Sequence, residues 1–175
     1  YSTDANVLGL THEAGELESL TTPTSRIEPG MGVFPQDGPE TGQSVEIRFE
    51  KGRAAAIDGV EGSPFDIVTR ANMIAGAHGV GIGLHAVENR FVGIKSRGIY
   101  EAPGLELLGH CHEYLTQLTL DRRARRIFEQ LSSTISEQIY QGYWFDTATQ
   151  ACWAGMECFS ALATGTIGVH LYKGN

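Results

Sequence analysis

Two polar segments hold most of the side chains that could bind a charged ligand. Residues 1–14 read YSTDANVLGLTHEA, and residues 87–104 read VENRFVGIKSRGIYEAPG. Each segment packs hydroxyls and carboxylates more densely than a plain strand or helix would bury without partners. These side chains suit a polar binding site, and they suit helix caps and loops equally well. The residue types alone leave the two interpretations open.

A third segment, His78–Gly83, is rich in glycine and could in principle let backbone amides approach a phosphate. A dinucleotide fingerprint follows a strand and opens a helix, whereas these glycines follow a stretch with helical periodicity. The GxxxxGK[ST] pattern of a phosphate loop is absent from the 175 residues. We therefore expect a structural turn here rather than a nucleotide site.

The run His110-Cys111-His112 resembles a metal cluster only on paper. Adjacent positions on a helix point about 100 degrees apart and cannot converge on one ion. Cys152 and Cys158 fall on different helix faces, so a disulfide between them is not expected. We expect no metal site, and we interpret the three cysteines as buried, reduced thiols in helices of a cytosolic protein.

The composition is that of an ordinary globular protein, with 41% hydrophobic and 19% charged residues and a formal charge of -8. This acidic balance argues against a nucleic-acid partner. The one basic cluster, at residues 122–126, is interpreted as a solvated helix face. No apolar run approaches the roughly 18 residues that cross a bilayer, so no membrane association is expected. The length suits one domain.

The first 60 residues indicate two strands that form a hairpin. Residues 44–50 alternate strictly between apolar and polar side chains, which predicts a half-buried strand. Residues 53–57 can return antiparallel, followed by a turn at Asp58-Gly59. We expect residues 1–18 to form a loop passing into a short helix. Residues 21–43 are expected to be irregular around a possible strand at 30–34.

Four helices and a last strand are predicted for the remainder. Ser63 followed by Pro64 starts the first helix, which ends near residues 76–83. Pro103 opens a helix to about 118, and Asp121 caps a third with an apolar stripe that ends at Gly142. A fourth is expected at 147–162, and a strand at 166–172. Together these elements predict an α+β fold with a mixed or antiparallel sheet packed against several helices.

The two polar segments resemble signatures of argininosuccinate synthase. The YSTDAN and THEA sequences are similar to the bacterial form, and ENRFVGIKSRGIYEAPG is similar to a block found throughout that family. The resemblance extends through VEIRFEKG, ANMIAGAHGVG and IYQGYWFD and so covers nearly the whole chain. The bacterial type of signature favours a role in arginine biosynthesis.

The resemblance implies the synthetase domain of a cytoplasmic two-domain ligase that assembles as a homotetramer. The family joins L-citrulline to L-aspartate with ATP and its Mg²⁺, through a citrullyl-adenylate, releasing AMP and pyrophosphate. Its N-terminal ATP pyrophosphatase domain contains an SGG-type phosphate loop, and a C-terminal arm holds the tetramer together. Neither the loop nor the arm is found in these 175 residues. We therefore expect a piece of a longer polypeptide, or a subunit whose partner domain is a separate chain.

The resemblance also assigns residues. Ser2, Thr11, Glu13, Glu88 and Tyr100 match positions that contact citrulline, and Asp4 matches a position that faces ATP. No protein nucleophile is implied, since the substrates react with one another once they are held in line. Without the resemblance, Ser2 or Asp4 would be interpreted as turn caps and Tyr100 as a core aromatic residue. The alternative function is a non-catalytic module that binds citrulline or aids assembly.

Overall fold

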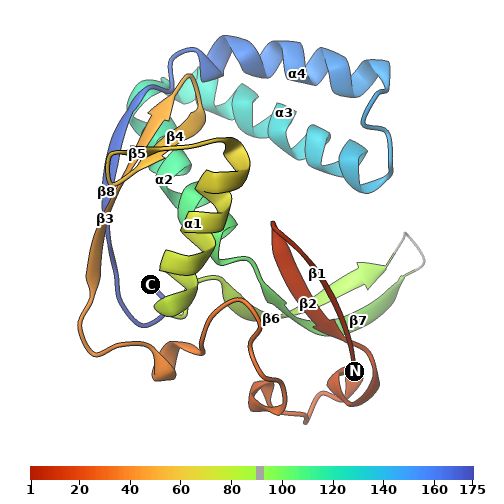
Figure 1. The fold of residues 1–175 in the computed structure, drawn as a ribbon. Helices are drawn as coiled ribbons and strands as arrows, with labels where there is room; N and C mark the ends of the chain where they lie inside the picture. The colour runs from red at the N-terminus through yellow and green to blue at the C-terminus, as the bar shows by residue number, and fades with distance from the viewer. Residues whose placement is uncertain (90–92) are drawn as a thin grey trace.

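The computed structural model describes residues 1–89 and 93–175, and the ribbon in Figure 1 follows them from end to end. These described residues fold into four α-helices and two four-stranded antiparallel sheets, which confirms the α+β class. Residues 90–92 of the ENRFVG motif lie outside the described residues. The elements are β1 Ser2–Asn6, β2 Gly9–Glu13, β3 Gln43–Glu50, β4 Arg53–Ile57, β5 Val60–Glu61, α1 Pro64–Ala77, β6 Ile82–Asn89, β7 Ile94–Glu101, α2 Pro103–Thr119, α3 Arg122–Tyr140, α4 Thr147–Ser160 and β8 Gly165–Leu171.

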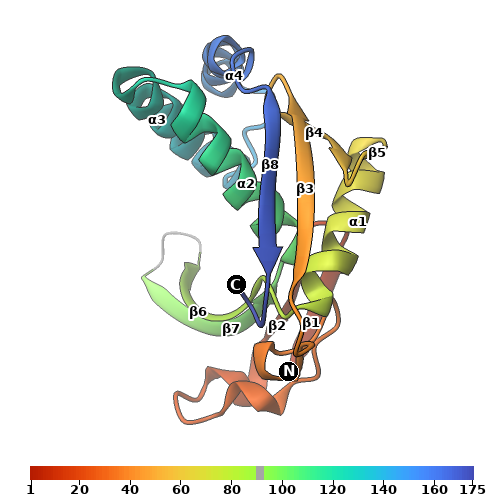
Figure 2. The same cartoon turned by 90° about the vertical axis from the view of Figure 1, so that its left-hand side faces the viewer.

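The sheet formed by the middle and last strands of the chain has the strand order β5-β4-β3-β8, and we call it sheet B. The predicted alternation of β3 is confirmed, because Val45, Ile47 and Phe49 are buried while Glu46 and Glu50 are exposed. Helices α1 and α2 both lie against the apolar side of this sheet, as Figures 1 and 2 show. The main hydrophobic core therefore fills the space between sheet B and these two helices.

The second sheet, sheet A, has the order β1-β2-β7-β6 and was only partly foreseen. Residues 1–18 form a hairpin followed by a 3₁₀ turn at Gly15–Glu18, so the prediction of a loop passing into a helix was wrong for β1 and β2. All five residues of β1 are exposed, so its sequence lacks the alternation of apolar and polar residues that predicts a half-buried strand. Backbone pairing with β2 forms this strand instead.

The segment between the two sheets is irregular, as expected, with 3₁₀ turns at Thr24–Arg26 and Pro35–Asp37. The possible strand at 30–34 does not form. This segment covers one face of sheet A, where Leu17, Ile27 and Ile99 make a small second core. The protein thus has two hydrophobic cores, one for each sheet.

The helix starts follow the predicted caps. Ser63 and Asp66 form a reciprocal capping box at α1, and the Asp121 carboxylate accepts hydrogen bonds from two backbone amides of α3. The α3 stripe is only partly covered, since Ile135 is buried but Ile127 and Ile139 are 49% and 40% exposed. Figure 1 shows α3 and α4 running side by side across the top of the view, with sheet A below them. Within residues 1–89 and 93–175, no helix has the length and apolarity that crossing a membrane requires.

The glycine-rich segment after α1 is the structural turn that we expected. Gly79 and Gly81 have φ values of 72° and 75°, in the region that favours glycine. A Cβ on Gly79 would lie 2.7 Å from the Cα of Pro35, and one on Gly81 would lie 2.6 Å from the Cα of Pro103. The glycines let three backbone segments pass close together.

The cysteines all lie in helices, but they are not all buried. Cys111 in α2 is buried, Cys152 in α4 is partly buried and Cys158 in α4 is exposed. The prediction of three buried thiols was therefore wrong for Cys158. It lies in α4, the helix along the top of Figure 1.

We expect iodoacetamide to label Cys158 first, Cys152 more slowly, and Cys111 only when the protein unfolds. Burial raises the pKa of the Cys111 thiol to about 11, so about one thiol in a thousand is ionised at pH 8. Peptide mass spectrometry over a labelling time course measures the three rates, and Cys158→Ser identifies the fastest. Labelling of native Cys111 as fast as Cys158 would contradict the order.

Candidate functional site

Five of the six predicted site residues lie on one face of sheet A. Cross-strand pairing sets Asp4 opposite Thr11 and Thr11 opposite Tyr100, and it sets Ser2 opposite Glu13. Side chains of directly opposed residues, and of residues two apart on one strand, point to the same side of a sheet. We call this side the polar face. Its thirteen positions with described side chains on the four strands are Ser2, Asp4, Asn6, Gly9, Thr11, Glu13, Gly83, His85, Val87, Ile94, Ser96, Gly98 and Tyr100.

A shallow cavity of about 360 Å³ opens beside three of these residues, Asp4, Thr11 and Tyr100. Ser2 and Asp4 are exposed, whereas Thr11, Glu13 and Tyr100 are partly buried. The Ser2 hydroxyl donates a long hydrogen bond of 3.5 Å to the backbone carbonyl of Glu13. Ser2 and Asp4 both lie within strand β1, and in the turn that follows it is the Asn6 side chain that accepts from the Leu8 amide, so the interpretation of Ser2 and Asp4 as turn caps is not supported.

Tyr100 sits in the middle of the polar face. Its ring meets the His85 ring edge-on, with 5.5 Å between centroids. Burial raises the pKa of the Tyr100 hydroxyl, and the negative charges of Glu13 and Glu18 and the nearby Tyr140 raise it further. The hydroxyl is therefore protonated at neutral pH and can donate a hydrogen bond to a ligand. His85 was not foreseen, because the strand that contains it was not predicted from the sequence.

Glu88 lies apart from the other five residues. It is on β6 opposite Lys95, two positions that alternate onto the reverse side of sheet A. The Lys95 ammonium donates to the Glu88 carboxylate at 2.8 Å, and both side chains are well exposed. The structure therefore brings Ser2, Asp4, Thr11, Glu13 and Tyr100 together and leaves Glu88 near the β6–β7 turn.

The reverse side of sheet A holds a buried ionisable pair that sequence reasoning missed. His12 Nε2 is 2.7 Å from a carboxylate oxygen of Glu101, and the two residues are 4% and 2% exposed. The Glu101 carboxylate also accepts hydrogen bonds from the backbone amides of Gly30 and Met31. This network ties the irregular segment to the back of the strands that form the polar face. The only sign of this pair in the sequence was Glu101, a charged residue two positions after the apolar Ile99 and therefore on the same face of the strand.

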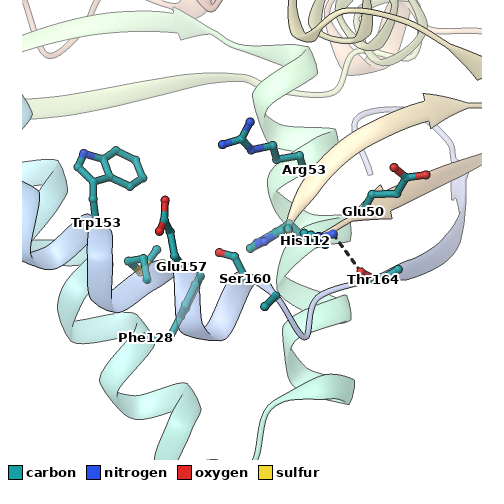
Figure 3. A pocket seen from close by; sticks show the side chains of 12 residues that line it. Glu50, Arg53, His112, Phe128, Trp153, Glu157, Ser160 and Thr164 are labelled. Carbon is teal, nitrogen blue, oxygen red and sulfur yellow. Dashed lines mark hydrogen bonds between the residues drawn. The ribbon is translucent and has the colours of Figure 1, made fainter.

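A larger cavity of about 900 Å³ lies at the other end of the molecule (Figure 3). The β3–β4 turn and helices α2, α3 and α4 line it, and Arg53 and Glu157 both extend into it. Burial lowers the pKa of His112, whose ring lies between those of Phe49 and Phe128. This cavity contains none of the predicted site residues. Across the described part of the chain, no three His, Cys, Asp or Glu side chains gather as metal ligands would.

Comparison with known proteins decides the family. A family model described as the arginosuccinate synthase C-terminal domain matches residues 1–175. The chain belongs to the argininosuccinate synthase family. This confirms the resemblance seen in the two polar segments and extends it to the whole chain, including the parts without a recognisable signature.

Curated members of the argininosuccinate synthase family are similar over the whole chain. The argininosuccinate synthase of Rhodopirellula baltica is 40% identical over 176 residues, covering 100% of this chain and 43% of the relative. That of Pseudoalteromonas atlantica is 41% identical over 174 residues, covering 99% of this chain and 42% of the relative. The chain thus spans about 43% of the length of these relatives.

Proposed function

We propose that the polar face of sheet A binds L-citrulline within an argininosuccinate synthase. The observation that supports this most strongly is the convergence of Ser2, Thr11, Glu13 and Tyr100 on one face, from three strands and from two segments that are far apart in sequence. These are four of the five residues that the family resemblance assigns to citrulline. An unrelated set of polar residues would have no reason to gather in this way.

The chemistry of the polar face suits a zwitterionic amino acid. The Glu13 carboxylate can accept hydrogen bonds from an α-ammonium group, while the hydroxyls of Ser2, Thr11 and Tyr100 can donate to an α-carboxylate. The face carries Asp4 and Glu13 but no Lys or Arg at its thirteen described positions. Such a surface favours an ammonium group and disfavours a triphosphate.

From the same charge distribution we propose that citrulline and ATP are bound mainly by different domains. In the proposed enzyme, the phosphates of ATP and their Mg²⁺ are bound mainly by an ATP pyrophosphatase domain, and Asp4 faces the nucleotide from the edge of the polar face. The ureido oxygen of citrulline attacks the α-phosphate of ATP, and the amino group of L-aspartate then displaces AMP. No protein nucleophile takes part, so this chain contributes by holding citrulline in line for attack. We further propose that the assembled enzyme is a cytoplasmic homotetramer.

Glu88 is included in the proposed citrulline site on the family resemblance alone. In an enzyme that joins this chain to an ATP pyrophosphatase domain, we expect Glu88→Gln to raise the citrulline KM about ten- to a hundred-fold. This corresponds to one lost charge-assisted hydrogen bond of about 1.5 to 3 kcal/mol. The ATP KM should change far less. Steady-state kinetics with each substrate varied in turn measures both constants.

Lys95→Gln provides the matched control, because it breaks the same ion pair and leaves the Glu88 carboxylate in place. If the pair only stabilises the β6–β7 hairpin, the two variants should behave alike, with a loss of stability of no more than about 1 kcal/mol and an unchanged citrulline KM. Identical kinetics for the two variants would remove Glu88 from the site and leave the polar face as the binding surface.

A further inference from the structure

Among the described positions of the polar face, the one histidine is His85, which lies beside two glycines. Cross-strand pairing sets His85 opposite Gly98, and it sets Gly83, two residues before His85, opposite Tyr100. A Cβ on Gly83 would lie 3.1 Å from Nε2 of His85, and one on Gly98 would lie 3.1 Å from Cε2 of Tyr100. The two rings therefore lie against strand backbone that carries no side chain.

The imidazole of His85 is available to a ligand. The residue is exposed, and its ring meets the Tyr100 ring edge-on without a hydrogen bond. Across residues 1–89 and 93–175, no protein group forms a hydrogen bond or an ion pair with either ring nitrogen of His85. An imidazolium donates from both of its nitrogens. His85 can therefore offer a charged donor to an anion.

His85 is also the one residue at the described positions of the polar face that can carry a positive charge. The other charged side chains at these positions are Asp4 and Glu13. Their carboxylates attract the α-ammonium group of a bound amino acid but repel its α-carboxylate. The hydroxyls on this face can donate hydrogen bonds, but they cannot neutralise a negative charge. The proposed ligand therefore requires one cation that only His85 can supply from these positions.

The spacing across the sheet suits the two charges of an amino acid. Ser2, Glu13, Gly98 and His85 form one row across the four strands. Neighbouring strands lie about 4.8 Å apart, so the backbones at Glu13 and His85 are about 10 Å apart, with Gly98 between them. The ammonium nitrogen and the carboxylate of an amino acid, with a hydrogen bond of about 2.8 Å at each end, span about 8 to 9 Å. A bound amino acid can place its ammonium group toward Glu13 and its carboxylate toward His85.

We propose that His85 binds the α-carboxylate of citrulline as an imidazolium. This inference rests on the proposed citrulline site and adds a residue to it. Binding takes up a proton whenever the imidazole is neutral in the free protein, so the affinity for citrulline falls as the pH rises. Carboxyl and phenol groups ordinarily titrate outside about pH 6 to 8. Those that share this face or act electrostatically on Tyr100 are Asp4, Glu13, Glu18 and Tyr140.

Two ligands test the proposal in an enzyme that joins this chain to an ATP pyrophosphatase domain. L-Citrulline is compared with L-citrullinamide, in which an uncharged amide replaces the α-carboxylate, added as a competitor. We expect His85→Ala to raise the citrulline KM about ten- to a hundred-fold and to change the inhibition constant of citrullinamide less than about three-fold. Glu13→Gln should weaken both ligands alike, because both keep the ammonium group. His110→Ala removes an exposed histidine of α2 and should change neither constant.

A pH series gives a readout that a purely structural role of His85 would not change. In the parent enzyme, the ratio of the citrulline KM to the citrullinamide inhibition constant should rise about ten-fold between about pH 6 and 8. His85→Arg keeps a cation and donors at this position. Its ratio should therefore stay constant over the same range. A constant ratio in the parent enzyme would overturn the proposal.

The substitutions also separate this inference from the proposed citrulline site. Equal weakening of both ligands by His85→Ala would overturn it, because His85 would then act through the shape of the face rather than on the carboxylate. An unchanged citrulline KM in His85→Ala, together with a raised one in Glu13→Gln, would overturn it and leave the citrulline site in place. If neither substitution changes the citrulline KM, both proposals are wrong.

Discussion

Citrulline-dependent release of pyrophosphate from ATP is expected to be absent from the purified 175-residue chain. The described positions of the polar face include no Lys or Arg to bind a triphosphate, and the glycines of segment 78–83 let backbone segments pass close together. The proposed reaction needs ATP and citrulline held in line, and we propose only a citrulline site for this chain. A coupled pyrophosphate assay on the purified chain measures the effect.

Adding the ATP pyrophosphatase domain of a relative should restore turnover to the range of about 1 to 1000 per second if the two parts associate correctly. Thr11→Val in the reconstituted enzyme provides a control, since it keeps the shape of the side chain and removes one proposed citrulline contact. Citrulline binding without any turnover after reconstitution would favour the alternative of a non-catalytic module. Turnover by the chain alone would contradict the division of labour proposed here.

The second large effect concerns stability. Glu101→Ala should lower the free energy of unfolding by about 3 to 5 kcal/mol, because it leaves His12 and two backbone amides without their buried acceptor. For a chain of this size the corresponding fall in Tm is roughly 6 to 20 °C. Urea unfolding followed by circular dichroism measures the loss.

Glu61→Ala is the matched control, since it removes a carboxylate that also forms an ion pair but is 77% exposed. We expect a much smaller change in stability from it, because solvent screens exposed pairs. Comparable losses from the two substitutions would show that the His12–Glu101 network does not anchor sheet A.

The sequence predicted sheet B and the helices well because their patterns are strong. β3 alternates along its whole length, and Ser63 and Asp121 are strong N-caps followed by suitable first turns. Sheet A was mostly missed for the opposite reason. All side chains of β1 are exposed and backbone pairing with β2 holds the strand, so its sequence has no alternation of apolar and polar residues.

The candidate site shows the same contrast. Family resemblance identified Ser2, Thr11 and Tyr100, but no local pattern could show that two segments so far apart share one face. That follows from the pairing of β2 with β7, which depends on the fold of everything between them. The pairing of β6 with β7 put Glu88 on the reverse side of the sheet and put His85 on the polar face. Neither position could be predicted, because β6 was not predicted and the alternation along a strand decides which face each side chain takes.

The pairing of β3 with β8 has a consequence for how the protein is made. Val45, Ile47 and Phe49 emerge from the ribosome early, but the strand that completes their sheet begins only at Gly165. At synthesis rates of about 5 to 20 residues per second, the roughly 120 residues in between take about 6 to 24 s. Throughout that interval the apolar side of the nascent hairpin lacks its final neighbour. The growing chain is therefore a natural client for chaperones that shield exposed strands during translation.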